Sequence, residues 1–191
     1  MTKHVMVDLE TWSTEQNAVL VAIGAVEFDP NDFGDPADER VARMKTFYQT
    51  IDPETFDSAF HISASTMKWW MSPERDDARR RLWRDWDEGA CEAGIAITEF
   101  ASWCKADSDD GLRVYGNGAM FDNTKVQWAH KHYTGWDAWA FYEDGCYRTI
   151  KGLAPDLKLE RWGTFHHALD DAISQALHMQ AVLARLGIKL S

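Results

Sequence analysis

Acidic side chains that could bind metal ions occur at three separate places in the chain. Asp8 and Glu10 stand two residues apart, Asp122 lies in the segment GNGAMFDN, and Asp171 follows His166 by five residues. Carboxylates are the hard oxygen ligands that Mg²⁺ and Mn²⁺ prefer, and an imidazole can accept a proton near neutral pH. The order of these residues predicts a site in which two divalent cations support cleavage of a phosphodiester.

The first pair of acids lies in a segment, KHVMVDLET, that is typical of a β-strand. Val5, Val7 and Leu9 alternate with Asp8 and Glu10, so the two acids share one face of the strand and can converge on one cation. Buried like charges repel each other and lose hydration, and a divalent metal would relieve both costs. An edge strand whose polar face is solvated is the alternative, and it is the commoner reading of an isolated D-x-E.

Asp122 follows a predicted short buried strand, LRVYGNG, and stands where a helix through about His132 begins. Junctions at the carboxyl ends of strands are where open α/β sheets bind their ligands. The alternative role is an acid that stabilises the helix dipole, which is worth only about 0.3 to 1 kcal/mol at an exposed position.

The segment HHALDDAISQALHMQAVLARL is the clearest predicted helix. Its apolar residues recur at helical spacing, which predicts packing against the sheet; they are Leu169, Ala172, Ile173, Ala176, Leu177, Leu183 and Leu186. Asp170 and Asp171 both fall on the flanks of this stripe, so helical geometry alone leaves open which acid points into a site. The choice between His166 and His167 is equally open.

The remaining pattern predicts an α/β fold with a mixed central sheet flanked by helices. We expect strands at 4–10, 19–29 and 45–51. Helical segments are expected at 65–86, with Ser65 or Thr66 as N-cap and a break at Pro73, and from Thr98 to Lys105. Acidic stretches at 29–39 and 106–111 are typical of solvated loops. The segment WRDWDEGACEAG, residues 83–94, has no role that the pattern assigns.

Composition predicts one globular domain over residues 1–191. The chain is 45% hydrophobic, contains ten tryptophans, and has an aromatic content too high for disorder. Apolar runs are too short to span a bilayer and no signal peptide is recognisable, which argues against a membrane or secreted protein. The three cysteines form no C-x-x-C pair, so neither a disulfide framework nor a zinc site is expected, and a reducing cytoplasm is the expected location.

The net charge of -11 argues superficially against a polyanionic partner. Metal ions in the acid cluster would neutralise part of this charge. Basic residues are also grouped, which leaves room for a locally positive groove, although a charged outer helix face explains the first group equally well. The groups are Arg75, Arg79, Arg80, Arg81 and Arg84, and then Arg148, Lys151, Lys158 and Arg161.

Taken together, D-x-E, the acid in N-G-A-M-F-D and the final H-x4-D closely resemble the DEDDh 3'-5' exonuclease superfamily, which includes RNase T and polymerase proofreading subunits. The matching motifs run in the family's order from residue 8 to residue 171. HISASTMKWWM and CYRTIKGL further resemble a branch of small bacterial and phage exonucleases that includes exoribonuclease-like members. The resemblance implies an RNase H-like fold.

The resemblance also implies roles for single residues. It makes Asp8, Glu10, Asp122 and Asp171 the ligands of two Mg²⁺ or Mn²⁺ ions, with His166 as the general base. It thereby selects Asp171 over Asp170 and His166 over His167.

Contacts to the terminal nucleotide are a further expectation. The third motif departs from the His-Asn pair of many proofreading members, because Asn117 and Gly118 stand there. Aromatic side chains near the acids could stack on bases, and an arginine could bind a phosphate. The candidate substrate contacts are Leu9, Thr11, His61, Trp69, Trp70, Asn117, Phe121 and Arg148.

The predicted activity is release of 5'-mononucleotides from the 3' ends of single-stranded RNA or DNA. A homodimer is expected as well. Two alternatives remain: a metal-dependent endonuclease or nucleotide phosphodiesterase on the same fold, and a catalytically idle module that only binds nucleic acid. H-x4-D disfavours the first, and an intact acid set, which would repel phosphate without metal, disfavours the second.

Overall fold

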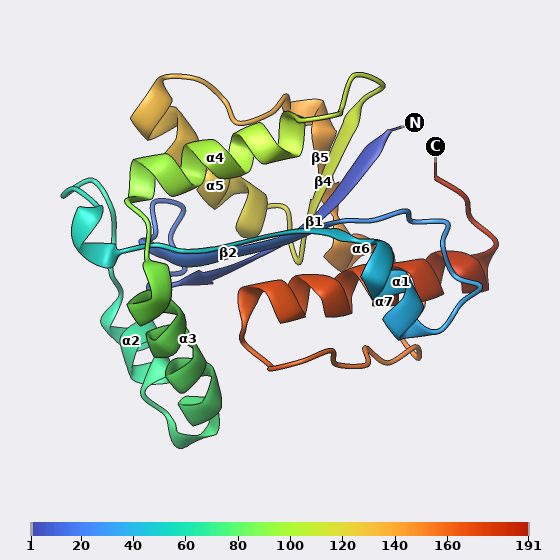
Figure 1. The fold of residues 1–191 in the computed structure, drawn as a ribbon, viewed down its shortest axis with the longest axis horizontal. Helices are drawn as coiled ribbons and strands as arrows, with labels where there is room; N and C mark the ends of the chain where they lie inside the picture. Colours follow the sequence, from blue (N-terminus) through green and yellow to red (C-terminus); the bar gives the residue numbers. More distant parts are fainter. Residues whose placement is uncertain (1, 191) are drawn as a thin grey trace.

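A mixed sheet forms the middle layer of the computed structural model, which describes residues 2–190 (Figure 1). Its strand order within the described residues is β3-β2-β1-β4-β5. β1, β2 and β3 are antiparallel neighbours, whereas β4 and β5 run parallel to β1. The strands are β1 (Lys3–Thr11), β2 (Leu20–Glu27), β3 (Lys45–Thr50), β4 (Leu112–Gly116) and β5 (Asp144–Cys146). The predicted α/β fold with a mixed sheet is confirmed.

Helices cover both faces of this sheet (Figure 1). α4 and α5 lie on one face, α7 lies along the other, and α2 and α3 lie beyond the end of the sheet at which β1 and β3 end and β2 begins. The helices are α1 (Ala37–Arg43), α2 (Ala64–Trp70), α3 (Asp76–Gly89), α4 (Ala93–Lys105), α5 (Asp122–Thr134), α6 (Tyr147–Lys151) and α7 (Ala168–Leu186). Short 3₁₀ turns are η1 (Pro53–Thr55), η2 (Pro73–Arg75) and η3 (Phe141–Glu143). The break predicted at Pro73 is the second of these turns.

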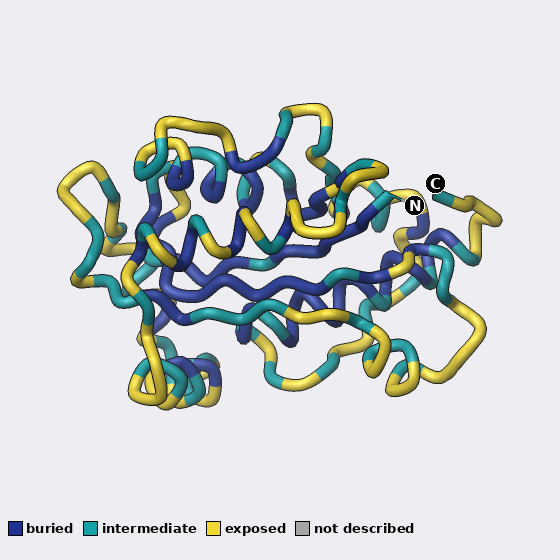
Figure 2. The backbone as a smooth tube through the Cα atoms, turned by 45° about the horizontal axis from the view of Figure 1, so that its top comes forward, coloured by how far each residue is buried: buried dark blue, intermediate teal, exposed yellow. Residues whose placement is uncertain are grey.

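Successive side chains of β1 point to opposite faces of the sheet, as the sequence predicts. Val5, Val7 and Leu9 are buried in the core under α4 and α5. Met6 belongs to the second core, which α7 covers. β1, β2 and β4 are buried almost throughout, the edge strands β3 and β5 are partly exposed, and many exposed residues lie in the connecting loops (Figure 2). Asp8 and Glu10 follow Met6 on its face of β1, so the sheet directs both acids toward the side on which α7 packs.

α7 approaches the sheet closely at Gly24 of β2, the residue that pairs with Asp8 across the strands. A Cβ atom at Gly24 would lie 2.1 Å from the amide nitrogen of Leu169 and 2.2 Å from the carbonyl carbon of Ala168. Such distances are far below van der Waals contact, so only glycine permits this approach. The start of α7 is thereby held directly against the strand beside Asp8.

The buried face of α7 is more polar than the predicted stripe. Leu186 is 40% exposed, whereas Asp170, Asp171, Ser174 and Gln175 are buried. Polar groups are tolerated there because they bond to one another and to neighbouring segments. This burial of polar atoms on a sheet-facing helix indicates a site rather than a simple core.

Several predicted boundaries are wrong. Ser63, not Ser65 or Thr66, caps α2 by accepting a hydrogen bond from the amide of Thr66. α4 begins at Ala93 after its N-cap Glu92, so Thr98 lies inside the helix instead of starting it. The reason is packing: Ala93, Ala96, Ile97 and Phe100 form a continuous buried face that extends the helix toward its N-terminus.

Other elements lack a predicted counterpart. α1 begins within the stretch 29–39 that was expected to be a loop, and α6 and β5 are too short for their periodicity to be recognised. Segment 83–94 forms the second half of α3 and its link to α4; the indole of Trp86 donates to the carbonyl of Val21. Within residues 2–190, every helix is too short or too polar to cross a membrane.

Candidate active site

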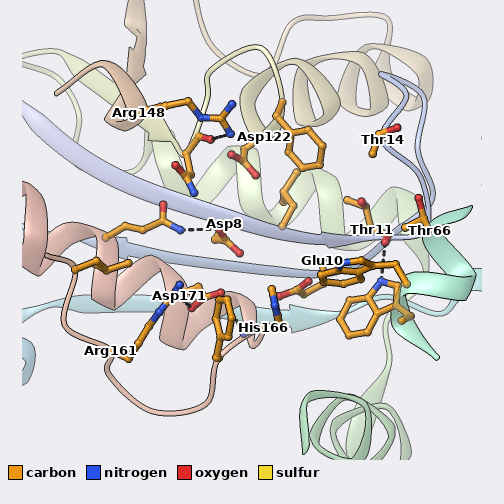
Figure 3. A pocket seen from close by; sticks show the side chains of 18 of the residues that line it. Asp8, Glu10, Thr11, Thr14, Thr66, Asp122, Arg148, Arg161, His166 and Asp171 are labelled. Atoms are coloured by element: carbon orange, nitrogen blue, oxygen red, sulfur yellow. Dashed lines mark hydrogen bonds and ion pairs between the residues drawn. The ribbon is translucent and has the colours of Figure 1, made fainter. Parts of the chain in front are cut away.

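The predicted acids and histidine line one cavity of about 600 Å³ (Figure 3). Its residues come from β1, the start of α5, the segment before α7 and α7 itself, with α2 on one side. Segments more than 150 residues apart in the chain therefore meet at one place. The acids are Asp8, Glu10, Asp122 and Asp171, and the histidine is His166.

The two acids of β1, Asp8 and Glu10, differ in the hydrogen bonds that their carboxylate oxygens accept. Oδ1 of Asp8 accepts a 2.7 Å hydrogen bond from the amide of Gln175 on α7. Oε1 of Glu10 is buried and has no hydrogen-bond partner among the described residues. A buried carboxylate oxygen without a donor is costly unless a cation or proton reaches it. Glu10 therefore has a coordination position open to a ligand.

Asp122 is held at the start of α5 by the turn after β4. Its carboxylate accepts hydrogen bonds from the backbone amides of Asn117 and Leu9. Gly116 permits this placement, because a Cβ atom there would lie 2.7 Å from Cβ of Asp122. The ammonium group of Lys125 lies one turn further along α5, where it donates to the carbonyl of Thr14 at 3.1 Å.

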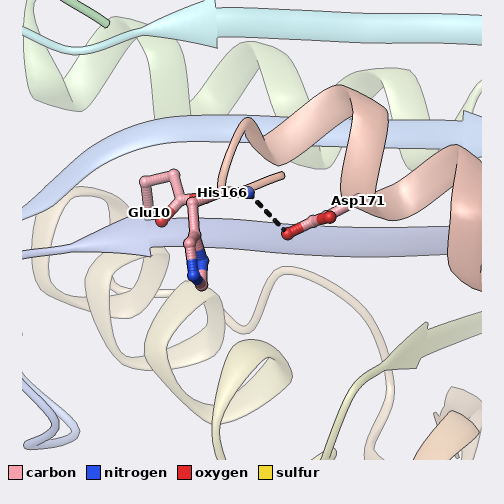
Figure 4. A group of neighbouring side chains, drawn as sticks. All are labelled: Glu10, His166 and Asp171. Atoms are coloured by element: carbon pink, nitrogen blue, oxygen red, sulfur yellow. Dashed lines mark hydrogen bonds between the residues drawn. The ribbon is translucent and has the colours of Figure 1, made fainter. Parts of the chain in front are cut away.

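The structure separates the two adjacent acids of α7. Oδ1 of Asp171 accepts from Arg161 at 2.7 Å, and Oδ2 accepts from the backbone amide of His166 at 3.2 Å (Figures 3 and 4). Asp170 instead turns away and accepts from the amide of Thr164 at 2.7 Å. Asp171 is thus the acid of this pair that lines the cavity.

The two adjacent histidines are separated in the same way. His167 is the N-cap of α7, where its ring accepts from the amide of Asp170. His166 has a φ of 62°, a left-handed conformation that is uncommon outside glycine and that projects its ring into the cavity. Phe165 stacks on that ring with centroids 3.7 Å apart, and Trp69 meets it edge-on at 4.8 Å. The left-handed backbone at His166 therefore places its imidazole, packed between two aromatic rings, in the same cavity as the acids.

Ligand atoms of Glu10, His166 and Asp171 lie within 4.8 Å of one another (Figure 4). This spacing would allow a single cation to contact several of them. The open oxygen of Glu10 and the oxygen-rich donor set fit a hard divalent ion. The residues present therefore fit the metal ions that the sequence pattern implies.

Burial and mutual repulsion hold the pKa values of the acids above their ordinary range. Desolvation raises the pKa of Asp8, and the charges of Asp122, Glu10 and Asp171 add to it. Desolvation likewise raises the pKa of Glu10, and it raises that of Asp122 to about 7 although Lys125 opposes the shift. A cluster that resists ionisation to this degree requires positive charge to become fully anionic at neutral pH.

The pKa of His166 moves in the opposite direction, to about 4. Desolvation is the largest cause, and the nearby charges of Arg75 and Arg161 add to it. His166 is consequently neutral at physiological pH, which leaves a ring nitrogen able to accept a proton.

Most of the predicted substrate contacts also line this cavity. Trp70 is buried and its indole donates to the carbonyl of Thr11 at 3.0 Å, whereas Trp69 is 37% exposed. The predicted contacts that line the cavity are Leu9, Thr11, Trp69, Trp70, Asn117, Phe121 and Arg148. His61 does not line it; its ring bonds to the hydroxyl of Ser13 at 2.7 Å.

Some cavity residues had no predicted individual role. Gln175 lies four positions after Asp171, which is one helical turn, so its place beside the acids was readable from helix periodicity. Arg161 and Lys151 were recognised only as members of a basic group. Phe165, Thr14 and Leu159 carry no sequence signal that marks them, because turns and side-chain packing alone bring them to the cavity.

The sheet order and the convergence of four acids and one histidine fit the RNase H-like fold that this chain shares with a solved DEDDh nuclease domain. It belongs to the family whose model is described as the 3'-5' exoribonuclease Rv2179c-like domain, which matches residues 3–183. This match confirms the predicted resemblance to 3'-5' exonucleases at the level of the family. No curated protein gives a significant match.

Solved structures of similar fold share little sequence with the chain. Exonuclease I of E. coli in complex with a dT13 oligonucleotide has a TM-score of 0.59 and 11% identity, and the alignment covers 98% of this chain and 42% of that one. Exonuclease I from Methylocaldum szegediense has a TM-score of 0.62 and 12% identity, and the alignment covers 98% of this chain and 41% of that one. The nuclease domain of 3'hExo, a DEDDh family member bound to rAMP, has a TM-score of 0.55 and 13% identity. That alignment covers 99% of this chain and 94% of the nuclease domain. The chain thus spans about two fifths of exonuclease I.

Proposed function

We propose that this chain is a metal-dependent 3'-5' exonuclease that removes 5'-mononucleotides from single-stranded nucleic acid, with RNA as the favoured strand. One observation carries the proposal: Asp8, Glu10, Asp122 and Asp171 line one cavity together with His166. The family's description as an exoribonuclease domain supports RNA. Exonuclease I, which has a similar fold, binds a DNA oligonucleotide, which makes DNA the second substrate to test.

Hydrolysis of a phosphodiester must overcome the repulsion between an anionic phosphate and the incoming water. Two Mg²⁺ or Mn²⁺ ions held by the four carboxylates would acidify that water and stabilise the departing 3'-oxygen. The carboxylates of Asp8 and Asp122 are fixed by the donors already described, so little reorganisation is needed when cations arrive.

His166 is placed to accept the proton of the attacking water. Its neutral ring is packed between Phe165 and Trp69 and lies beside Glu10 and Asp171. General-base assistance of this kind contributes roughly 10²- to 10⁴-fold to a rate.

The same cavity also suits a nucleoside. Leu9, Phe121 and Trp69 provide apolar surface beside the acids, and Thr11 and Thr66 add hydroxyl groups. Aromatic faces accept any base, so binding there would be sequence-tolerant. Arg148 and Lys151 lie on the same cavity wall, where they could contact phosphate oxygens.

The direct test is incubation of 5'-labelled single-stranded oligomers, RNA and DNA of matched sequence, with the protein and Mn²⁺. We expect a ladder of products shortened one nucleotide at a time, released 5'-mononucleotide and faster trimming of RNA. Asp122→Asn should abolish this ladder, whereas Asp137→Asn, which removes an exposed carboxylate paired with Lys131, should not change it.

Substitution of the proposed base separates chemistry from metal binding. His166→Asn, which keeps a residue tolerant of left-handed backbone, should lower kcat roughly 10²- to 10⁴-fold while Mn²⁺ affinity stays within a few fold. Internal cleavage products, or full activity in Asp122→Asn, would refute the exonuclease assignment. A homodimer remains a prediction that sedimentation of the same samples would test.

A further inference from the structure

A second cavity of about 570 Å³ adjoins the proposed active site. Phe165 and His166 line both cavities, so the segment Gly163–His166 forms the wall between them. The far side of the second cavity is one face of α3, which presents Asp77, Arg80, Arg81 and Arg84 at helical spacing. The second cavity thus lies next to the proposed active site, on the other side of the segment that carries the proposed base.

The arginines of this cavity are only partly neutralised. Arg80, with a side chain 78% exposed, pairs with Asp76, and Arg84, 58% exposed, pairs with Asp85 at 3.4 Å. Two acids, Glu74 and Asp77, also line the cavity. Among the lining residues, Arg80, Arg81 and Arg84 stand against these two acids, and Glu74 is paired with Arg75. Asp76, Asp85 and Asp170 pair with the three arginines from outside the lining.

Arg81 connects the arginine face to the wall. Its guanidinium lies 3.7 Å from Asp170 and 3.5 Å from the hydroxyl of Thr164. Nε of Arg81 is buried and makes no hydrogen bond to any described residue, although Asp85 lies 3.7 Å away. The Arg81 side chain as a whole is 36% exposed, and a guanidinium with several donors is suited to an anion with several oxygens, such as a phosphate.

We infer that this cavity binds the sugar-phosphate backbone of the substrate strand upstream of the scissile bond. The inference rests on the proposed function. The aromatic cavity beside the acids suits the terminal nucleoside, whereas the second cavity is lined mainly by charged side chains and backbone. Contacts to phosphates position a strand without reading its bases, as a sequence-tolerant exonuclease requires.

The inference also accounts for the charge balance. With a net charge of -11, the molecule as a whole repels a polyanion. Three arginines on one face of α3, next to the proposed active site, offer guanidinium groups that could exchange their carboxylate partners for phosphates of the strand. Part of the basic group at residues 75–84 therefore belongs to the proposed binding surface for the strand. Arg79 does not, because its guanidinium bonds to the carbonyl of Ser72.

Substrate length provides the test. The variant Arg80→Gln/Arg84→Gln removes two exposed guanidiniums that hold no fold contact beyond neighbouring α3 acids. KM and kcat would be measured with Mn²⁺ on oligoadenylates of two to twelve nucleotides at several salt concentrations. The matched control is Arg43→Gln/Arg185→Gln, which removes two similarly exposed arginines, one on α1 and one at the end of α7.

We expect KM for the twelve-nucleotide strand to rise roughly fivefold in Arg80→Gln/Arg84→Gln, as loss of two exposed ion pairs implies. The slope of log KM against log salt should fall by about 1.4, since each single-strand phosphate contact contributes about 0.7. Dinucleotide kinetics should match wild type, because its one phosphate lies at the acids.

Two results would overturn the inference while leaving the exonuclease assignment intact. One is an unchanged KM for long strands, which would place the upstream strand elsewhere, for instance past Arg148 and Lys151. The other is an equal rise in KM in the control variant, which would mean that net charge alone matters. A wild-type protein that trims no oligomer would instead contradict the proposed function itself.

Discussion

The amide of Gln175 on α7 donates a 2.7 Å hydrogen bond to Oδ1 of Asp8 on β1, although 167 positions separate the two residues. This bond lowers the pKa of Asp8, against the larger effect of burial, and it fixes the orientation of the carboxylate. Gln175 lines the cavity, and its side-chain amide is bonded to a proposed metal ligand. It is a positioning residue, and its effect should appear in metal binding.

Replacement of Gln175 by leucine should weaken Mn²⁺ binding roughly 10- to 100-fold, the usual cost of losing an outer partner of a metal ligand. Isothermal titration with Mn²⁺ measures this directly. Gln180→Leu is the matched control, because Gln180 lies on the same helix, is equally buried and donates to the carbonyl of Asp29 instead. An equal loss of Mn²⁺ affinity in both variants would show that the substitutions disturb α7 as a whole and not the bond to Asp8.

The raised pKa values of the acids predict how stability depends on pH in a chelator. Folding raises the pKa of Asp122 from 3.8 to about 7, so between these values the folded chain holds a proton that the unfolded chain has released. Stability is therefore highest at the acidic end of this window and is lost as pH rises through it.

Thermal unfolding should thus give a lower Tm at pH 8 than at pH 5.5 in EDTA, and Mn²⁺ should raise Tm more at pH 8. Asp122→Asn should flatten the dependence in EDTA, because the amide does not titrate. Two observations together would contradict the raised pKa of Asp122: a wild-type Tm in EDTA that rises between pH 5.5 and pH 8, and the same rise in Asp122→Asn.

Trp69 should contribute to substrate binding more than to folding. Its ring lines the cavity and is partly exposed, and the guanidinium of Arg75 lies over one face of it at 3.9 Å. Trp69→Ala should raise KM roughly 5- to 150-fold, the equivalent of about 1 to 3 kcal/mol of base stacking. Trp83→Ala, at a tryptophan 60% exposed on α3, provides the control, and similar KM values for the two variants would exclude Trp69 as a stacking surface.

Gly24 should be essential to the placement of α7. Gly24→Ala forces a methyl group against the backbone of Ala168 and Leu169 and should cost about 1 to 3 kcal/mol of stability. Displacement of the helix start would also reduce Mn²⁺ affinity. Gly34→Ala, where an added Cβ meets no atom within 4 Å, should leave both unchanged. Wild-type Tm and Mn²⁺ affinity in Gly24→Ala would mean that the close approach is dispensable.

Sequence periodicity predicted β1 and α7, and the strand and glycine turn before Asp122 predicted where α5 begins. Val5, Val7 and Leu9 face the core as their alternation requires, and α5 begins at Asp122 as expected. The start of α4 was not predictable in this way, since its first turn is helical through packing of Ala93 and Ala96 rather than through a capping serine or threonine.

The site itself was predictable only in part. Helical geometry could not choose between Asp170 and Asp171, and the resemblance to a family made that choice. The left-handed backbone of His166 and the ion pair between Arg161 and Asp171 depend on how a patternless segment folds back on α7. His61 illustrates the converse: it stood in a motif that resembled the family, yet its ring is bonded to Ser13 outside the cavity.

The position of α7 late in the chain has a consequence for biosynthesis. A ribosome delivers Asp8, Glu10 and Asp122 well before His166 and Asp171, and the first three acids alone lack both the proposed base and the fourth ligand. Cleaving ability would arise only after α7 has emerged and docked onto β1 and β2. On the proposed mechanism, a nascent polypeptide tethered beside its own messenger is harmless to that messenger until translation of the helix is complete.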